Sequence, residues 1–303
     1  MFRATRSLLG PIRLMRSALF YPGTKLKVLE KARNIPTDVL IFDLEDSVTP
    51  EYKNIARQNV MKILEEGEFG KKTVAVRINR LESPWGHDDL AAISPLESLH
   101  AVVVPKVESP DTLKTISMEL DDSYFVDRRA SLWPHIETPM GILNVAAIAG
   151  CGLNRVTCML MGTSDMTAGL QAQQTPSRTA LLYSLCKCIV AARSFGLQIL
   201  DGQYLNIEDD EEFEVVCQQA KDLGFDGKTL AHPKHVEATN RIFGPSYQQL
   251  EKAQRVIRAY EEARFNGEGI TLLDGKMIEK LHVEEARKLI ELYELVQMVH
   301  LKR

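Results

Sequence analysis

Residues 39–46 read VLIFDLED. The first four are apolar, and such a short uninterrupted run is typical of a strand buried on both faces of a parallel sheet. The run passes directly into three carboxylates, Asp43, Glu45 and Asp46. In parallel barrels the active site lies at the carboxyl ends of the strands. The stretch therefore predicts a parallel strand that ends at a candidate catalytic site.

Seven more apolar runs of this kind occur along the chain, and segments with a helical pattern separate most of them. We predict strands at 18–21, 39–42, 74–78, 101–104, 132–136, 156–161, 197–200 and 227–230. We predict helices near 24–34, 50–65, 110–120, 139–149, 178–195 and 209–223, and a weaker one at 86–93. Eight such units indicate an α/β fold, a closed (β/α)8 TIM barrel. An open doubly wound sheet is the alternative, but the dinucleotide fingerprint GxGxxG is absent.

The alternation ends after His232. We expect helical structure over 233–265 with an interruption at 244–245, then a loop that contains Asp274 and Gly275, and a final helix at about 281–299. This tail is too long for the barrel wall. The sequence thus predicts a catalytic barrel at 16–243 and a C-terminal helical extension at 244–303, which serves as a lid or an oligomer contact.

The first 29 residues contain no Asp or Glu, but six Arg or Lys with apolar residues between them. An Arg-rich, acid-poor start is typical of an organelle-targeting presequence. We therefore expect residues 1–15 to be a presequence, or else a disordered tail. The expected location is the mitochondrial matrix, with the cytoplasm as the alternative. The five cysteines form no CxxC pair, which favours reduced thiols.

The overall composition is that of an ordinary globular protein, with 45% hydrophobic and 26% charged residues. The formal net charge is -4, so no basic field is available to attract nucleic acid. No apolar run approaches the ~18 residues that a membrane-spanning helix needs. We therefore expect neither nucleic acid nor membrane as a partner, and look for a small-molecule ligand.

Polar side chains follow seven of the predicted strands. In a barrel these strand ends share one rim, so the side chains converge on one mouth. Glu137 and Asp165 come from adjacent strands and could hold Mg²⁺, which prefers oxygen ligands and keeps several waters. Arg77 offers a planar fork for a carboxylate or an oxyanion, and Lys106 adds a second positive charge.

Other catalytic arrangements are not supported by the sequence. No nucleophile-elbow motif accompanies a Ser-His-Asp set. His232 and His235 lack a third zinc ligand nearby. The set at the mouth instead indicates metal-assisted formation or collapse of an enolate.

An ordered series of motifs resembles the citrate lyase beta-subunit and malyl-CoA lyase proteins of the HpcH/HpaI aldolase superfamily. It covers nearly the whole chain from Arg16, and the presequence-like start makes the chain most similar to free-standing organellar citrate lyase beta-like proteins. The motifs are RSALFYPG at 16–23, FDLEDSV at 42–48, VRIN at 76–79, PKVE at 105–108, IETPMG at 136–141, GTSD at 162–165, GFDGK at 224–228, HP at 232–233 and DGKM at 274–277.

This resemblance implies a TIM barrel, assembled as a homotrimer or a dimer of trimers. It implies Mg²⁺ on Glu137 and Asp165, and Arg77 as the group that binds the 2-oxo acid and stabilises the enolate oxygen. The carboxylates of residues 43–46 would orient Arg77 or a metal-bound water. Arg16 would lie near the phosphates of CoA, and the turn at Pro233 would touch its adenine.

In relatives of this kind the C-terminal segment reaches a neighbouring subunit and delivers an aspartate two residues after the Met of DGKM. Here that position is Glu279, which keeps the carboxylate but adds a methylene. Ser164 is a second departure, because many relatives have an acidic residue there. We expect Glu279 to act as the base, or its substitution to mark a changed activity.

The resemblance implies a carbon–carbon lyase that cleaves citramalyl-CoA or malyl-CoA to acetyl-CoA and pyruvate or glyoxylate. A malyl-CoA thioesterase on the same scaffold is the first alternative, and it would release free CoA. An aldolase acting on free acids would not bind CoA. A non-catalytic or degenerate subunit is the last alternative, and the presence of Arg77, Glu137 and Asp165 argues against it.

Overall fold

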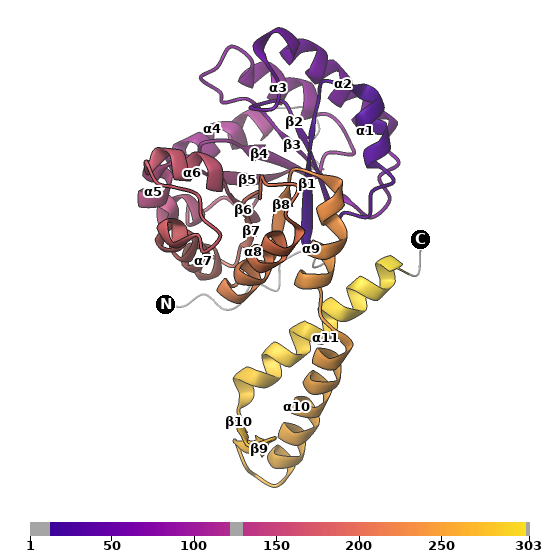
Figure 1. Ribbon diagram of the computed structural model, residues 1–303, viewed down its shortest axis with the longest axis vertical. Coiled ribbons are helices and arrows are strands. Elements are labelled where there is room, and N and C mark those ends of the chain that lie inside the picture. The colour runs from indigo at the N-terminus through magenta and orange to yellow at the C-terminus, as the bar shows by residue number, and fades with distance from the viewer. Residues whose placement is uncertain (1–12, 122–129, 301–303) are drawn as a thin grey trace. The chain divides into compact units, whose positions relative to one another are not determined.

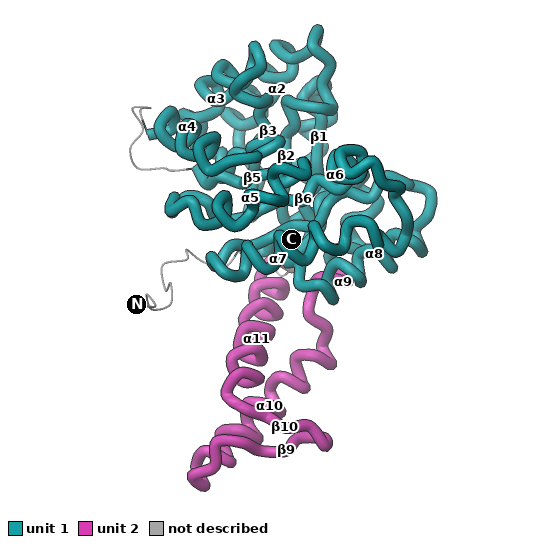
Figure 2. Tube along the Cα trace, turned by 90° about the vertical axis from the view of Figure 1, so that its left-hand side faces the viewer, with its two compact units in different colours: residues 1–240 teal, residues 241–303 magenta. Residues whose placement is uncertain are grey.

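The computed structural model describes residues 13–121 and 130–300, except the side chain of His300. Most of the expected presequence therefore lies outside the described residues. The chain forms two compact units, residues 1–240 and 241–303 (Figure 2). The first carries the predicted barrel and the second carries the predicted extension.

Eight parallel strands of the first unit form a closed barrel in chain order, in which β8 pairs with β1 (Figure 1). All eight predicted strands are present, so the TIM-barrel prediction is confirmed. The sixth is shorter than expected, because Val156 only bridges to Leu132 ahead of it. The strands are β1 (Ser17–Pro22), β2 (Val39–Asp43), β3 (Thr73–Arg77), β4 (Ala101–Val104), β5 (Ser131–Ile136), β6 (Cys158–Met161), β7 (Gln198–Asp201) and β8 (Gly227–Leu230).

Helices surround the barrel in Figure 1. One of them, α6, was not predicted, because its sequence TSDMTAG is short and lacks an apolar face. The helices of this part of the chain are α1 (Leu26–Ala32), α2 (Lys53–Glu66), α3 (Gly86–Ile93), α4 (Pro110–Asp121), α5 (Pro139–Ala149), α6 (Thr163–Gly169), α7 (Leu182–Ser194), α8 (Asp210–Leu223) and α9 (Val236–Phe243).

The barrel interior is filled by side chains at alternate strand positions, as the two-residue period of a strand requires. Ala18 and Phe20 of β1, Val39 and Ile41 of β2 and Ala75 of β3 belong to this core. The next inward positions of the same strands, two residues on, therefore lie at the mouth. This alternation places the chemically active side chains described below.

The second unit is built on α10 (Tyr247–Phe265) and α11 (Lys280–His300). Ser246 begins α10 with a capping box, and both helices contribute to a small apolar core with Ile278. Between the helices the structure has a two-stranded antiparallel hairpin, β9 (Thr271–Leu273) and β10 (Lys276–Ile278), where a loop was expected. Asp274 and Gly275 form its turn, both with positive φ. The Asp-Gly pair was the sequence signal for this hairpin.

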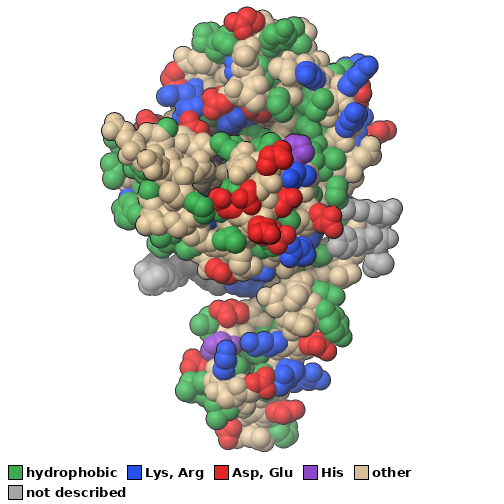
Figure 3. Space-filling model, in the orientation of Figure 1, with side chains coloured by type: hydrophobic (Ala, Val, Ile, Leu, Met, Phe, Trp, Pro, Cys, Tyr) green, Lys and Arg blue, Asp and Glu red, His purple; other side chains and the backbone are tan. Residues whose placement is uncertain are grey.

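Side chains of both signs are spread over the face shown in Figure 3. Acidic side chains gather on the part that carries α8, whose first turn holds Asp210, Glu211 and Glu212. Carboxylates at a helix start are favoured by the helix dipole, so they need no ligand to explain them. Within the described residues, no helix is long and apolar enough to span a membrane.

Candidate active site at the barrel mouth

A cavity of about 370 Å³ lies at the carboxyl ends of the barrel strands. The alternation of the core continues into it: two residues after Ile41 stands Asp43, and two residues after Ala75 stands Arg77. The ionisable side chains that line the cavity are Asp43, Asp46, Arg77, His135, Glu137 and Asp165. The mouth predicted from the strand ends thus forms one continuous site.

Arg77 is held in one orientation. Its Nε and Nη2 donate to the two carboxylate oxygens of Asp43, at 2.6 and 2.7 Å. The ring of Phe20 lies against the guanidinium, with its centroid 4.9 Å from Cζ. Burial would raise the pKa of Asp43, but the charge of Arg77 and its hydrogen bonds outweigh burial and lower it. Asp43 is therefore the charged partner that fixes the Arg77 fork.

The remaining nitrogen of Arg77, Nη1, faces the acidic segment after β2. It lies 3.2 Å from Glu45 Oε2 and 3.9 Å from Asp46 Oδ2. The Lys106 ammonium bonds both carboxylates, at 2.7 Å to Glu45 and 3.1 Å to Asp46. Burial raises the pKa of Glu45 to about 7 against the opposing effect of Arg77. Four predicted site residues thus form one network of alternating charge.

Lys106 has a left-handed backbone, with φ of 51°. A non-glycine residue in this region is disfavoured by contact of its Cβ with the backbone. The conformation lets one residue make two contacts, because its backbone N–H donates to Glu137 Oε1 at 2.8 Å while its ammonium bonds Glu45. Lys106 therefore joins the acidic segment to the end of β5.

Glu137 follows β5 and is 1% exposed. Burial and the nearby carboxylate of Asp165 raise its pKa to about 7. Its Oε2 is buried without a hydrogen-bond partner, and lies 3.2 Å from Nδ1 of His135, which also has none. Burial and the charge of Arg77 lower the pKa of His135 to about 3, so this imidazole is neutral.

Glycine 162 explains how Glu137 fits. A Cβ at Gly162 would lie 2.2 Å from Glu137 Cβ and 2.6 Å from its Oε2. Three residues further on, Asp165 stands in the first turn of α6, exposed and lining the cavity. The absence of a side chain at 162 is what allows the two carboxylates to share one side of the mouth.

The two carboxylates fit a magnesium ion. Glu137 has an unpartnered buried oxygen, and burial and a second carboxylate raise its pKa. A bound cation would relieve both effects. No group of three or more His, Cys, Asp and Glu within the described residues is placed to hold a metal. A pair of carboxylates suffices for Mg²⁺, since it retains water ligands, but falls short of a zinc site.

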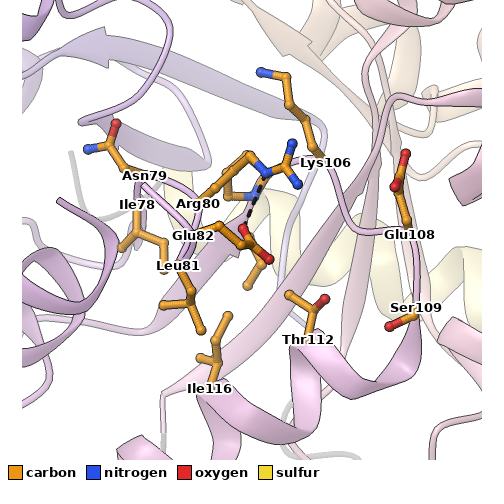
Figure 4. Close-up of a pocket in the computed structure, with 12 residues that line it drawn as sticks. Ile78, Asn79, Arg80, Leu81, Glu82, Lys106, Glu108, Ser109, Thr112 and Ile116 are labelled. Atoms are coloured by element: carbon orange, nitrogen blue, oxygen red, sulfur yellow. Dashed lines mark hydrogen bonds and ion pairs between the residues drawn. The ribbon is translucent and has the colours of Figure 1, made fainter. Parts of the chain in front are cut away.

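A second cavity of about 230 Å³ lies beside the mouth, between the loops after β3 and β4 (Figure 4). Arg80 and Glu82 form an ion pair at 3.3 Å on one side, and Ser109 and Thr112 lie on the other. Lys106 lines this cavity but its ammonium contacts the acidic segment of the mouth. The lysine thus lies between the two cavities.

One expected contact is not supported by the fold. Arg16 precedes β1 and therefore lies at the amino end of the barrel, away from the mouth. It is 4% exposed, and its guanidinium bonds both carboxylate oxygens of Asp38 at 2.8 Å. The expectation that Arg16 lies near the phosphates of CoA is corrected accordingly: its fork is occupied by Asp38, just before β2, and it joins two strand starts.

Pro233 is not among the residues that line the mouth, and Glu279 belongs to the second unit. Pro233 begins a 3₁₀ turn after β8, two residues beyond Ala231, which lines the mouth. Glu279 is an exposed residue directly after β10 in the second unit, and its backbone N–H donates to His282 Nδ1. The structure brings together Arg77, Glu45, Asp46, Lys106, Glu137 and Asp165.

Sequence reasoning missed Phe20 and His135 as parts of the mouth, because both stand inside apolar runs. The signal that could have identified them is their position in the strand. Phe20 stands two residues after the core residue Ala18, and His135 stands two residues after the core residue Trp133. Trp133 is a core residue with 3% exposure.

The family of the chain follows from its sequence. A family model described as HpcH/HpaI aldolase/citrate lyase matches residues 16–233, which include every strand of the barrel. The chain belongs to this family. A (3S)-malyl-CoA thioesterase of Cereibacter sphaeroides is 39% identical over 273 residues, covering 90% of this chain and 92% of the relative. The citrate lyase subunit beta of Escherichia coli K12 is 31% identical over 287 residues, covering 93% and 94%.

Solved structures agree with this assignment. CitE from Mycobacterium tuberculosis, in complex with magnesium, acetoacetate and coenzyme A, has a TM-score of 0.75 and 25% identity, covering 92% of this chain and 97% of CitE. A citrate lyase from Burkholderia xenovorans has a TM-score of 0.81 at 15% identity, covering 94% and 93%, and supports the fold alone.

Proposed function

We propose that the protein is a Mg²⁺-dependent carbon–carbon lyase acting on a small hydroxyacyl-CoA thioester. Citramalyl-CoA and malyl-CoA are the candidate substrates, with acetyl-CoA and pyruvate or glyoxylate as products. The observation that carries the proposal is the fixed Arg77 fork in the same cavity as the paired carboxylates Glu137 and Asp165. A relative named citrate lyase subunit beta, and a solved relative that contains magnesium, acetoacetate and coenzyme A, support this choice.

Glu137 and Asp165 would hold the Mg²⁺. The ion would supply Lewis-acid polarisation of the oxygens at the oxo-acid end of the substrate. Arg77 would stabilise the negative charge that develops as the carbon–carbon bond breaks, since Nη1 is the nitrogen not committed to Asp43. Glu45 and Asp46 would keep Nη1 in place by their charges, and Lys106 would hold these two carboxylates.

Bond cleavage also needs a base that takes the proton of the substrate hydroxyl and returns a proton to the acetyl carbon. We propose Glu279 of a neighbouring subunit for this role, and a homotrimer or a dimer of trimers as the assembly. Its exposure directly after β10 leaves its carboxylate available to another chain. The extra methylene of glutamate must be accommodated by the backbone, because catalytic geometry is sensitive to shifts of about 1 Å.

Turnover of both thioesters, with Mg²⁺ and with EDTA and with all products identified, tests the proposal. Magnesium-dependent release of pyruvate or glyoxylate together with acetyl-CoA is the expected result. The products would also identify the acyl group, which differs between the two candidate substrates by one methyl. A pocket discriminates a single methyl by only about 1–3 kcal/mol. If neither thioester yields an oxo acid, the lyase proposal is contradicted.

A thioesterase is the second candidate, because the relatives at 39% identity include malyl-CoA thioesterases. The same cations could stabilise the oxyanion formed when water attacks the thioester carbonyl. The same assay separates the two, since a thioesterase releases free CoA and the intact hydroxy acid. Free CoA without an oxo acid would favour it.

We also propose that the protein works in the mitochondrial matrix, with residues 1–15 as its presequence, on the basis of their arginines and lack of acidic residues. A fluorescent fusion with residues 1–15 removed should lose mitochondrial localisation, while the full chain should retain it. Unchanged localisation would reject the presequence.

A further inference from the structure

Lysine 53, the first residue of α2, lies directly behind the acidic segment of the mouth. It is only 6% exposed. Its ammonium has three donors, and each bonds an uncharged oxygen: Leu44 O at 2.8 Å, Glu45 O at 2.7 Å and Asn79 Oδ1 at 2.6 Å. A buried ammonium whose donors all meet neutral oxygens is costly unless its charge is balanced nearby.

Carboxylates that it does not contact directly offset part of this cost, although burial still lowers the pKa of Lys53. The charges of Asp43 and Glu45 act on the ammonium from the mouth side, and that of Asp89 from the α3 side. The ring of Trp85 covers it, with its centroid 5.3 Å from Nζ. Lys53 therefore bonds the backbone of the acidic segment while the side chains of that segment remain free for Arg77 and Lys106.

The third acceptor, Asn79, connects this bond to the rest of the barrel. Its Nδ2 donates to Leu44 O at 2.8 Å and to Asp89 Oδ2 at 2.6 Å. Asp89 is 0% exposed and accepts from Arg57 Nε at 2.7 Å. The carbonyl of Leu44 thus has two donors, and both are fixed to helices behind the barrel.

Fixing these two carbonyls orients the peptide units that carry Glu45 and Asp46. With both carbonyls directed at Lys53, the N–H of Glu45 donates to Asp43 Oδ1 at 3.0 Å, and the N–H of Ser47 to Asp43 Oδ2 at 3.2 Å. The Asp43 carboxylate that holds Arg77 is thereby held itself. The chain of contacts runs from Lys53 through the backbone to Asp43, and from Asp43 to the Arg77 guanidinium.

We propose that Lys53 is a positioning residue of the active site, which sets the backbone of residues 44–46 and through it the orientation of Arg77. The expected effect of Lys53 on turnover rests on the proposed function. Its effect on geometry does not depend on that function. No direct contact of Lys53 with the substrate is part of the proposal.

The test compares Lys53→Met with Lys72→Met. Methionine keeps the apolar stem and removes the ammonium. Lys72 is a matched control, since its ammonium also donates to a backbone carbonyl, Arg33 O at 2.8 Å, just before β3 at the other end of the barrel. Lys53→Gln, which retains two donors, takes the place of Lys53→Met if that variant does not fold. Crystal structures and steady-state kinetics with Mg²⁺ are measured for each protein.

In Lys53→Met we expect residues 44–46 to be displaced and the Glu45–Arg77 contact to be lost. We expect kcat to fall about tenfold or more, because reacting groups shifted by about 1 Å lose on the order of 100-fold. The KM for the thioester should stay within about twofold, and Lys72→Met should match the wild type in both readouts.

Two results would overturn the proposal: residues 44–46 in their wild-type position in the Lys53 variant, or a kcat lowered no more than in Lys72→Met. Wild-type protein without turnover would reject the proposed function instead. In that case a displaced segment in the variant crystal structure would still support the positioning role, and an undisplaced one would reject it.

Discussion

At the scale of single residues, the mouth depends on charges that compensate one another at contact distance. Arg77 meets Asp43 and Glu45, and Lys106 meets Glu45 and Asp46. Glu137 differs, since its contacts are the backbone N–H of Lys106 and the neutral ring of His135 rather than an Arg or Lys side chain. The residues with compensated charge are positioned before any ligand arrives, whereas Glu137 is the residue with an interaction still to make.

Replacing Glu137 by Gln, or Asp165 by Asn, should remove magnesium-dependent turnover. Each change deletes one of the two charges assigned to the ion while keeping the size of the side chain. We expect at least about a 100-fold loss of kcat/KM and weaker Mg²⁺ binding. Calorimetric titration with Mg²⁺ and product analysis check this. Asp88→Asn, at a side chain 70% exposed, is the control. Wild-type magnesium affinity in both site variants would refute the assignment.

Replacing Gly162 by Ala should displace Glu137, because the added Cβ would lie 2.6 Å from the carboxylate oxygen that lacks a partner. We expect at least about a tenfold loss of Mg²⁺ affinity and about 1–3 kcal/mol of destabilisation from overpacking. Gly269→Ala is the matched control, since a Cβ added at that glycine has no neighbour within 4 Å. The free energy of unfolding in urea and the Mg²⁺ titration separate the two variants. Equal free energies of unfolding and equal Mg²⁺ affinities in the two variants would contradict the prediction, because the strand ends would then move freely.

At the scale of elements, the barrel was predictable because most strands are short apolar runs and polar side chains follow seven of the eight. The hairpin β9–β10 was missed because its strands are three residues long and half-exposed, so no apolar run marks them. Of the site, the charged residues were found from their strand ends. His135 was not, because it lies inside a strand. The role of Lys53 depends on backbone carbonyls, which a sequence does not display.

The end of β7 carries a buried ion triad that should make the barrel sensitive to acid. Asp201 is 0% exposed and accepts from Arg178 at 2.7 Å and from Lys228 at 2.6 Å. Burial alone would raise the pKa of Asp201, but the charges of Lys228 and Arg178 outweigh it and lower the pKa. The folded state therefore binds this proton more weakly than the unfolded state does.

This contribution to stability is present above the unfolded pKa of about 3.9 and is lost as pH falls through the lower folded pKa. Asp201→Asn should cost about 3–5 kcal/mol at pH 7, since two buried cations lose their counter-charge. The variant should also lose less stability than the wild type between pH 5 and about pH 3. Urea unfolding across that range measures both. Parallel pH curves would exclude Asp201 as the titrating group.

At the scale of the whole molecule, the chain divides its residues between two units: a barrel with the carboxylates proposed to bind the metal and an extension with Glu279. If the base comes from another subunit, two inactive variants should complement each other. Glu137→Gln supplies an intact Glu279, and Glu279→Gln supplies an intact barrel. Co-expressed in equal amounts in a cyclic oligomer, they should form active sites at about a quarter of the positions.

Activity of the mixed oligomer, compared with that of each variant alone, measures this complementation. Mass determination by light scattering gives the assembly in the same experiment. Chains that carry both Glu137→Gln and Glu279→Gln, mixed with wild-type chains, are the control for subunit exchange. A mixture no more active than its parts, from chains that demonstrably exchange, would place the base within one subunit or on another residue.

The left-handed backbone of Lys106 has a consequence for the evolution of the protein. Glycine would adopt φ of 51° without the cost of about 1–2 kcal/mol that a side chain incurs there. It would also remove the ammonium that bonds Glu45. Selection for heat resistance alone should therefore favour glycine at 106, while selection for turnover retains lysine. Residue 106 is thus a position at which robustness and catalysis select opposite residues.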